Sequence, residues 1–314
     1  MHRYIVFSLA LCFVLAPGFT QTDGQIIDKT RLVGLDQLID YVRETEKRDT
    51  IDFDSTRFEY FTDVEVFGIT YYSDSLKVRG FLLTPEKPGQ YPSIIYNRGG
   101  SLEFGSLTSS HASIGLGELA RLAREGYVIA ASQYRGNGGG EGQEEYGGAD
   151  INDVLNLIPV LAQVPAADTS RLGMFGWSRG GMTSFLTLKK TDQIKALAVG
   201  GPSTDITRSV VDRPELLEWW KAFVPGIHEN QYEVLKVRSA VFWVDELPTN
   251  VPILMLQGNE DKSLLPASTL RFALELDKYK ITYRLVMFEN GQHSLRQHQD
   301  EVFSQITRWF RKYL

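Results

Sequence analysis

The sequence predicts an α/β fold in which a mostly parallel central sheet is covered by helices on both faces. Short apolar runs recur along the chain, and amphipathic stretches separate most of them. Strands that are apolar throughout are typical of a parallel sheet buried on both faces. The apolar runs lie at 93–96, 127–132, 171–175, 195–199, 252–257 and 281–288, and the helical stretches at 114–124, 149–163, 179–190, 266–278 and 297–313.

The composition is that of an ordinary globular protein. Of the 314 residues, 43% are hydrophobic and 23% are charged, which is enough apolar surface for a full core. The net charge is −6 and no block of like charges is present, so we expect no nucleic-acid partner, because phosphate binding needs clustered Lys and Arg. The chain contains neither a Walker-type loop nor H-E-x-x-H. We therefore expect no metal and no organic cofactor.

Residues 1–20 have the layout of a secretory signal peptide. His2 and Arg3 precede a largely apolar run at 4–15, and small and polar residues follow it. The run is too short to cross a membrane, which takes roughly 20 apolar residues. Cys12 is the only cysteine, so a chain cut after this segment can form no disulfide. We expect a secreted or periplasmic protein with no stable membrane span.

The rest of the chain divides into two parts. Residues 21–58 are predicted to be a helical lead-in, because apolar residues recur there at helical spacing. Residues 59–314 are predicted to form the α/β domain, which begins with strands at 60–72 and 76–84. Within this domain, 202–248 interrupts the alternation of strands and helices. It predicts a helical, cap-like insertion before the next strand.

The strongest motif surrounds Ser178. The run Gly-Trp-Ser-Arg-Gly-Gly at 176–181 joins an apolar strand to a helical stretch. A G-x-S-x-G sequence between a strand and a helix predicts a nucleophile elbow. Side chains at Gly176 and Gly180 would collide with neighbouring backbone in so tight a turn. The motif makes the predicted fold an α/β-hydrolase fold and Ser178 the candidate nucleophile.

A serine hydroxyl is a weak nucleophile and needs a general base. His293 follows the apolar run 281–288, which places it at the carboxyl edge of the sheet, where the elbow also lies. His298 falls at the start of the last helix, and His111 and His228 fall in polar loops. His293 is therefore the predicted base.

The carboxylate that orients the histidine should follow another strand. The run 252–257 leads to Glu260 and Asp261, and both are candidates. In the alternative interpretation they are solvated loop acids beside Lys262.

An oxyanion hole needs two backbone N–H groups. One is expected from Arg179, the residue after the nucleophile, and the other from Arg98 or Gly99 in the loop after the strand at 93–96. Glycine lets the main chain approach a substrate oxygen closely. The alternative is a glycine turn that serves geometry alone.

Taken together, these motifs resemble the catalytic domain of the prolyl oligopeptidase family of serine peptidases. The resemblance covers roughly 60–314. It rests on the elbow at 176–181, Tyr134-Arg135-Gly136 with the glycine-rich 138–142, Tyr146-Gly147-Gly148, Gly258-x-x-Asp261 and Gly291-x-His293. It implies a Ser178, Asp261 and His293 triad, with Asp261 rather than Glu260 as the acid, and substrates that are short peptides.

Three features depart from the family pattern. About 40 residues separate the signal from the first strand of the domain, too few for the N-terminal β-propeller of the larger members. Arg179 stands where the peptidases usually have Tyr, and Arg98 where Tyr or His often precedes the loop glycines. Three functions therefore stay open: a peptidase acting on short peptides, a carboxylesterase acting on small acyl or sugar esters, and a binding protein on a hydrolase scaffold.

Six residues are expected to contact the substrate: Arg98, Arg179, Tyr134, Trp219, Trp220 and Trp243. The two arginines could select substrates with an acidic group, because a guanidinium forms paired hydrogen bonds with a carboxylate. The alternative is that Arg179 packs against a loop acid, such as Glu144, Glu145 or Asp150. The sequence leaves the oligomeric state undetermined.

Overall fold

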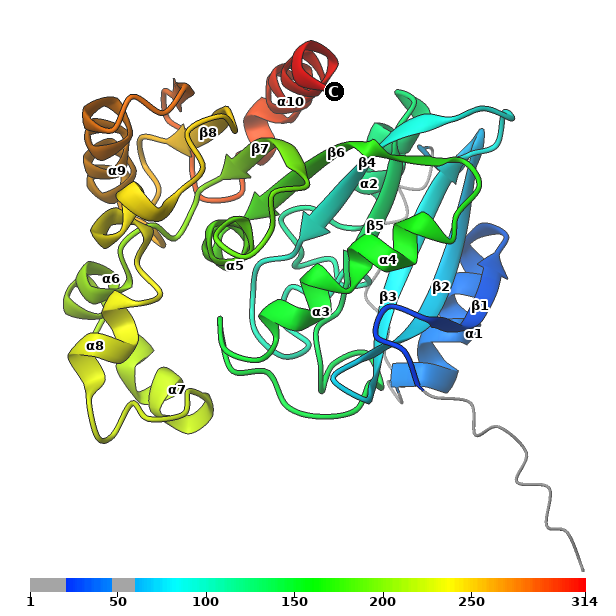
Figure 1. The fold of residues 1–314 in the computed structure, drawn as a ribbon, viewed down its shortest axis with the longest axis horizontal. Coiled ribbons are helices and arrows are strands. Elements are labelled where there is room, and N and C mark those ends of the chain that lie inside the picture. Colours follow the sequence, from blue (N-terminus) through cyan, green and yellow to red (C-terminus); the bar gives the residue numbers. More distant parts are fainter. Residues whose placement is uncertain (1–20, 47–59) are drawn as a thin grey trace, which may run out of the picture.

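The computed structural model describes residues 21–46 and 60–314, with a nine-stranded sheet at its centre. In chain order the strands are β1 (Ile26–Leu32), β2 (Val64–Ser73), β3 (Leu76–Pro85), β4 (Tyr91–Asn97), β5 (Val128–Ser132), β6 (Ala167–Trp177), β7 (Ile194–Gly200), β8 (Ile253–Gly258) and β9 (Tyr283–Phe288). Across the sheet their order is β1-β2-β3-β5-β4-β6-β7-β8-β9 (Figure 1).

Most of the sheet is parallel. Pairing is antiparallel from β1 through β2 and β3 to β5, and parallel from β5 through β4 and β6 to β9. Every residue of β5 and β8 is buried, which is why these strands are apolar throughout rather than alternating. The predicted mostly parallel sheet is confirmed.

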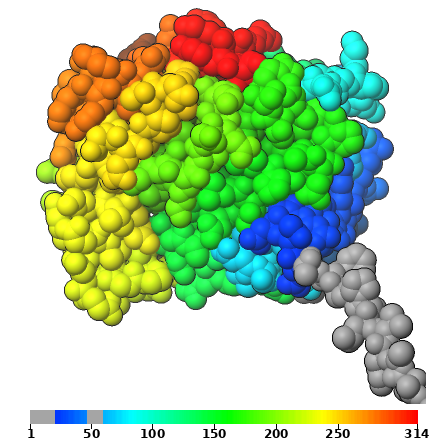
Figure 2. Space-filling model, in the orientation of Figure 1, coloured from blue at the N-terminus to red at the C-terminus, as the bar shows by residue number. Residues whose placement is uncertain are grey.

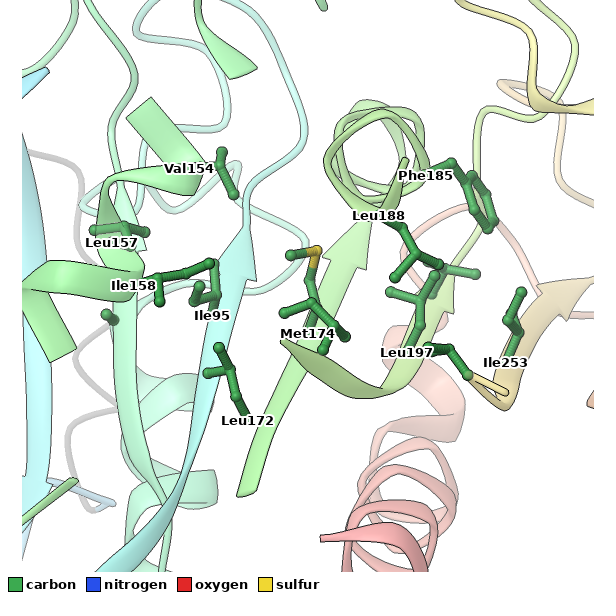
Figure 3. Packing of buried hydrophobic residues seen from close by; sticks show 14 of the residues in the cluster. Ile95, Val154, Leu157, Ile158, Leu172, Met174, Phe185, Leu188, Leu197 and Ile253 are labelled. Carbon is green, nitrogen blue, oxygen red and sulfur yellow. The ribbon is translucent and has the colours of Figure 1, made fainter. Parts of the chain in front are cut away.

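Helices cover both faces of the sheet (Figure 1). One face carries α3 (Ile151–Leu155), α4 (Leu157–Ala162), α5 (Arg179–Leu188) and α9 (Pro266–Lys278), and the other carries α1 (Gly34–Glu46), α2 (Leu116–Arg124) and α10 (Gln299–Tyr313). Figure 3 shows the first layer: Val154, Leu157, Phe185 and Leu188 pack against Ile95, Met174 and Leu197 of the sheet. Because β4, β6, β8 and β9 run in the same direction, their carboxyl ends lie at one edge of the sheet, and the two helical layers hold the sheet in place.

Two local predictions differ from the structure. The lead-in contains the edge strand β1 as well as a helix, and five of the seven residues of β1 are exposed, so no apolar pattern marked it. The helix predicted over 149–163 is divided at Asn156 into α3 and α4. Pro159 lies one turn further on and lacks the N–H that would bond to the carbonyl of Leu155, which accounts for the break.

The segment 202–248 holds three α-helices between β7 and β8, which are α6 (Ile206–Asp212), α7 (Glu215–Phe223) and α8 (Gln231–Lys236), followed by two short 3-10 helices. Ile206, Trp220 and Val224 of this insertion form a small apolar cluster with Tyr146 and with Met182 of α5. In Figure 2 the yellow part of the chain, which includes α8, forms one flank of the molecule, opposite the blue β1. The insertion therefore packs against the helix that begins at the elbow.

Candidate active site

Ser178 lies in the turn between β6 and α5. Its φ is 57°, in the left-handed region that a residue other than glycine seldom adopts. A Cβ at Gly176 would collide with the carbonyl oxygen of Gly180, and a Cβ at Gly180 would collide with that of Asn97. Both glycines are therefore needed for the turn, as the motif predicts.

The structure brings Ser178, His293 and Asp261 into one chain of hydrogen bonds. Nε2 of His293 lies 2.9 Å from Oγ of Ser178, and Nδ1 lies 2.8 Å from Oδ2 of Asp261. With its proton on Nδ1, facing the carboxylate, the imidazole leaves Nε2 free to accept the serine proton. The indole of Trp177 donates to the carbonyl of His293 at 3.2 Å and fixes the loop that carries the base.

Asp261, and not Glu260, is the carboxylate beside the histidine. Asp261 is buried, whereas Glu260 is exposed. Its Oδ1 accepts the N–H groups of Ser263 and Leu264 at 2.8 and 2.9 Å. Burial raises the pKa of Asp261, but the hydrogen bond and charge of His293, with these two N–H groups, outweigh burial and lower the pKa below its ordinary value. The carboxylate is therefore ionised at neutral pH.

The loop after β4 reaches the nucleophile. A Cβ added to Gly99 would lie 3.0 Å from Cβ of Ser178 and 2.9 Å from the carbonyl oxygen of Trp177, so this position has room only for glycine. Arg179 is the first residue of α5. Both segments that were predicted to supply oxyanion donors therefore adjoin Ser178.

A pocket of about 570 Å³ opens above Ser178 and His293. One wall is aromatic and aliphatic, and it comes from Tyr146 and from the insertion; its members are Tyr146, Ile206, Leu216, Trp219 and Trp220. Arg213 and Arg296 also line the pocket, and no Asp or Glu is among the described residues around it. The site can therefore enclose an apolar group next to a scissile bond.

The six residues expected to contact substrate separate into two groups. Trp219, Trp220 and Arg179 line the pocket, whereas Arg98, Tyr134 and Trp243 do not. Trp243 is 5% exposed and belongs to the core cluster that includes α9, and Arg98 and Tyr134 are fully buried. In contrast to the prediction, the structure does not place these three side chains against the pocket but packs them inside the protein.

The sequence analysis missed several pocket residues: Tyr146, Ile206, Leu216, Arg213 and Arg296. Tyr146 belongs to a quoted motif, yet nothing in that motif shows which way the ring points. The other four come from the insertion and from the loop after His293, and their position depends on how those segments fold back.

Arg179 packs against a loop acid, as the alternative interpretation had it. Its Nη1 lies 2.8 Å from Oε2 of Glu144, the first of the three acids considered. The guanidinium carbon lies 4.8 and 4.6 Å from the ring centroids of Tyr134 and Tyr146. All three guanidinium nitrogens of Arg179 are buried. Arg179 therefore lines the pocket with its other atoms, and its charged group does not face the pocket.

This packing predicts no charge selectivity at Arg179. We expect Arg179→Met to lower kcat/KM by the same factor for a neutral substrate and for its carboxylate-bearing counterpart, because the guanidinium cannot reach either. The measurement is the ratio of the two rates in the wild type and in the variant. A loss confined to the acidic substrate, of the 1.5–3 kcal/mol that is typical of one charge-assisted hydrogen bond, would restore the selectivity hypothesis.

Comparison with known proteins defines the class of protein first. Structures with this fold include acylaminoacyl peptidase from Pyrococcus horikoshii, with a TM-score of 0.69 and 22% identity over 85% of this chain and 44% of that one. An acetyl xylan esterase from Paenibacillus has a TM-score of 0.61 and 16% identity over 89% of this chain and 94% of that one. The chain has the α/β-hydrolase fold.

The family follows from the sequence comparisons. The prolyl oligopeptidase family matches residues 114–314. The uncharacterized peptidase YtmA of Bacillus subtilis is 30% identical over 202 residues, which are 64% of this chain and 75% of that protein. Dipeptidyl peptidase family member 6 of Caenorhabditis elegans is 25% identical over 196 residues, 58% of this chain but only 26% of the relative. The chain belongs to the prolyl oligopeptidase family, and it spans less than half the length of several of its relatives.

Proposed function

We propose that the protein cleaves short peptides through an acyl-enzyme on Ser178, with His293 as general base and Asp261 as the orienting acid. The observation that carries this proposal is the chain of two hydrogen bonds, 2.9 and 2.8 Å long, that ends at an elbow below a pocket. Membership of a serine peptidase family supports the choice of an amide substrate.

In the first half-reaction, Oγ of Ser178 attacks the scissile carbonyl carbon while Nε2 of His293 takes the hydroxyl proton. The carbonyl oxygen becomes an oxyanion, which the backbone N–H groups of Arg179 and of Gly99 stabilise. The imidazolium then gives its proton to the leaving amine as the C–N bond breaks. In the second half-reaction water attacks the acyl-enzyme by the same route, and the acid product and Ser178 are released.

The second candidate is a carboxylesterase for small acyl or sugar esters. It is supported by the likeness to an acetyl xylan esterase that matches over 94% of its length, whereas the acylaminoacyl peptidase matches over 44% of its length. The same triad would act, with an alcohol in place of the amine as leaving group.

A paired substrate panel separates the two candidates. We expect the protein to release nitroaniline from N-blocked peptidyl anilides with an apolar residue at the acyl position, since the pocket wall is aromatic and aliphatic. Release of nitrophenol from short-chain esters is measured alongside, with the Ser178→Ala variant as the blank. Hydrolysis of esters without any hydrolysis of peptidyl anilides would contradict the peptidase and favour the esterase.

The pH dependence follows from the state of the triad. We expect kcat/KM to be low in acid and to level off at higher pH, because only a neutral imidazole can accept the proton of Ser178. The lowered pKa of Asp261 keeps this carboxylate ionised from about pH 5 upward, so Asp261 adds no second inflection to the pH–rate profile. A flat profile from pH 5 to 8 would contradict a histidine base.

The lowered pKa of Asp261 also affects the stability of the fold. It stabilises the folded state above about pH 3.9, the ordinary Asp value, and that stabilisation is lost as the pH falls through the lower folded-state pKa.

We also propose that the protein acts outside the cytoplasm after removal of its signal peptide. The support is the layout of residues 1–20, which lie outside the described residues. Between residues 21 and 46 and from residue 60 onward, no helix has both the length and the apolar character that a membrane crossing needs. Mass measurement of the protein recovered from the growth medium and from cell fractions tests this, and an intact N-terminus in the cytosolic fraction would contradict it.

A further inference from the structure

We propose that Arg98, Glu144 and Arg179 form a buried charge cluster that holds the oxyanion loop, residues 98–105, in the conformation that presents Gly99 to Ser178. In this proposal Arg98 and Glu144 are positioning residues, which act on the reaction through the loop. The proposal rests on the proposed acyl-enzyme function. It also explains the two arginines that depart from the family pattern.

The oxyanion loop has a conformation that needs outside support. Gly100, Leu102 and Gly105 have φ values of 71°, 50° and 78°. Leucine pays a steric penalty in this left-handed region that glycine does not. A Cβ on Gly100 would also collide with the carbonyl oxygen of Phe104, so the loop folds tightly on itself. Such a conformation persists only where surrounding contacts impose it.

Two buried charged groups hold Leu102 from both sides. Its N–H donates to Oε1 of Glu144 at 2.7 Å, and its carbonyl accepts Nη2 of Arg98 at 3.0 Å. The Arg98 guanidinium also donates to the carbonyl of Gln133, which follows β5, at 2.9 Å from Nη2 and 3.2 Å from Nε. A fourth bond from Arg98, 3.2 Å long, runs from Nη1 to the carbonyl of Gly99. Arg98 thus ties both Leu102 and Gly99 to the end of a core strand.

Arg179 supplies the counter-charge that keeps Glu144 in this role. Burial raises the pKa of Glu144, but the charges of Arg179 and Arg98 outweigh burial and lower the pKa below its ordinary value. Arg179 directly follows Ser178, so its ion pair with Glu144 connects the nucleophile helix to the loop that faces it. The hydroxyl of Tyr134, whose ring stacks on Arg179, donates to the carbonyl of Arg98 at 3.1 Å and closes the cluster.

The cluster is sealed from the pocket. Arg98 is fully buried, Glu144 is 1% exposed, and the guanidinium nitrogens of Arg179 have no exposed surface to offer a substrate. These charged groups therefore position the backbone of Gly99 and Leu102 and do not contact a charge on the substrate. Removing Glu144 would take a buried negative charge away from two buried guanidinium groups, so we expect the three residues to depend on one another.

Glu144→Ala tests the proposal, with Glu145→Gln as the matched control. Glu145 is the neighbouring acid, and its Oε2 accepts the N–H of Ala149, which lies outside the oxyanion loop. We expect Glu144→Ala to lower kcat about 100-fold, the effect of losing one oxyanion donor, with KM changed less than threefold. The rate constant for labelling Ser178 with a fluorophosphonate should fall by the same factor, because that adduct also places an oxygen in the oxyanion hole. Glu145→Gln should leave both rates within twofold of the wild type.

A second variant covers the case in which Glu144→Ala fails to fold. Arg98→Lys keeps the buried positive charge, but an ammonium cannot bridge the carbonyls of Gln133, Leu102 and Gly99 as the planar guanidinium does. We expect the same loss of kcat and of labelling rate in folded protein, checked by circular dichroism. If either folded variant has a lowered melting temperature but wild-type kcat and labelling, the cluster is structural only and the proposal is wrong. A wild type that is not labelled at Ser178 would instead contradict the acyl-enzyme itself.

Discussion

Ser178→Ala should abolish both hydrolysis and covalent labelling by a fluorophosphonate while leaving the fold intact. In the proposed reaction Oγ becomes acylated, and it lies 2.9 Å from Nε2 of His293, the proposed proton acceptor. Loss of a triad nucleophile typically costs several powers of ten in kcat, on the order of 10⁶ where it has been measured in another serine hydrolase. Activity on a chromogenic peptide and gel fluorescence after labelling give the two readouts.

The control for this change is Ser209→Ala. Ser209 also lines the pocket, but its hydroxyl donates to the carbonyl of Asp205, the N-cap residue of α6, and not to the triad. We expect this variant to keep most of its activity and all of its labelling. Both variants remove one hydroxyl, so the melting temperatures should stay close to that of the wild type. A Ser178→Ala protein that retained a tenth of wild-type activity would show that another residue is the nucleophile.

Sequence reasoning worked best for features that local motifs encode, and the three triad residues are the main example. Ser178, Asp261 and His293 each follow the end of a strand, and strand ends on one edge of a parallel sheet must converge, so local motifs were enough to bring them together. Strand β1 was missed for the opposite reason. It is an edge strand whose exposed side chains carry no apolar period, and only its pairing with β2 makes it a strand.

The substrate-contact predictions show where sequence reasoning ends. Trp219, Trp220 and Trp243 lie in one insertion and have the same chemistry, yet two line the pocket and one is packed in the core. Arg179 pairs with Glu144, and Arg98 and Glu144 both bond to the backbone of Leu102, whereas the sequence offered Glu144 only as one of three acids near Arg179. These roles depend on the direction of each side chain and on contacts between distant parts of the chain, and no fixed spacing in the sequence predicts either.

His293→Ala and Asp261→Asn should be the next most damaging changes. Without the imidazole, nothing takes the Ser178 proton, and because triad members act as a unit the loss should approach that of Ser178→Ala. Asn at 261 would place an amide where Oδ2 now accepts Nδ1–H of His293 at 2.8 Å, which favours the tautomer whose Nε2 is protonated and cannot act as a base. A loss on the order of 10⁴ in kcat is expected by analogy with another serine hydrolase.

Matched neighbours make this prediction specific. Glu260→Gln removes a charge one position before Asp261, from an exposed side chain, and His298→Ala removes an imidazole whose Nε2 lies 3.0 Å from the carbonyl of Glu289 rather than from the triad. We expect both variants to stay within a few-fold of wild-type kcat. Steady-state kinetics on one peptide substrate, at a pH on the plateau of the wild-type profile, compares all four. If Glu260→Gln were more damaging than Asp261→Asn, the orienting acid would be Glu260. In that case the buried, low-pKa carboxylate at 261 would serve the loop 261–264, whose N–H groups it accepts, and not the imidazole.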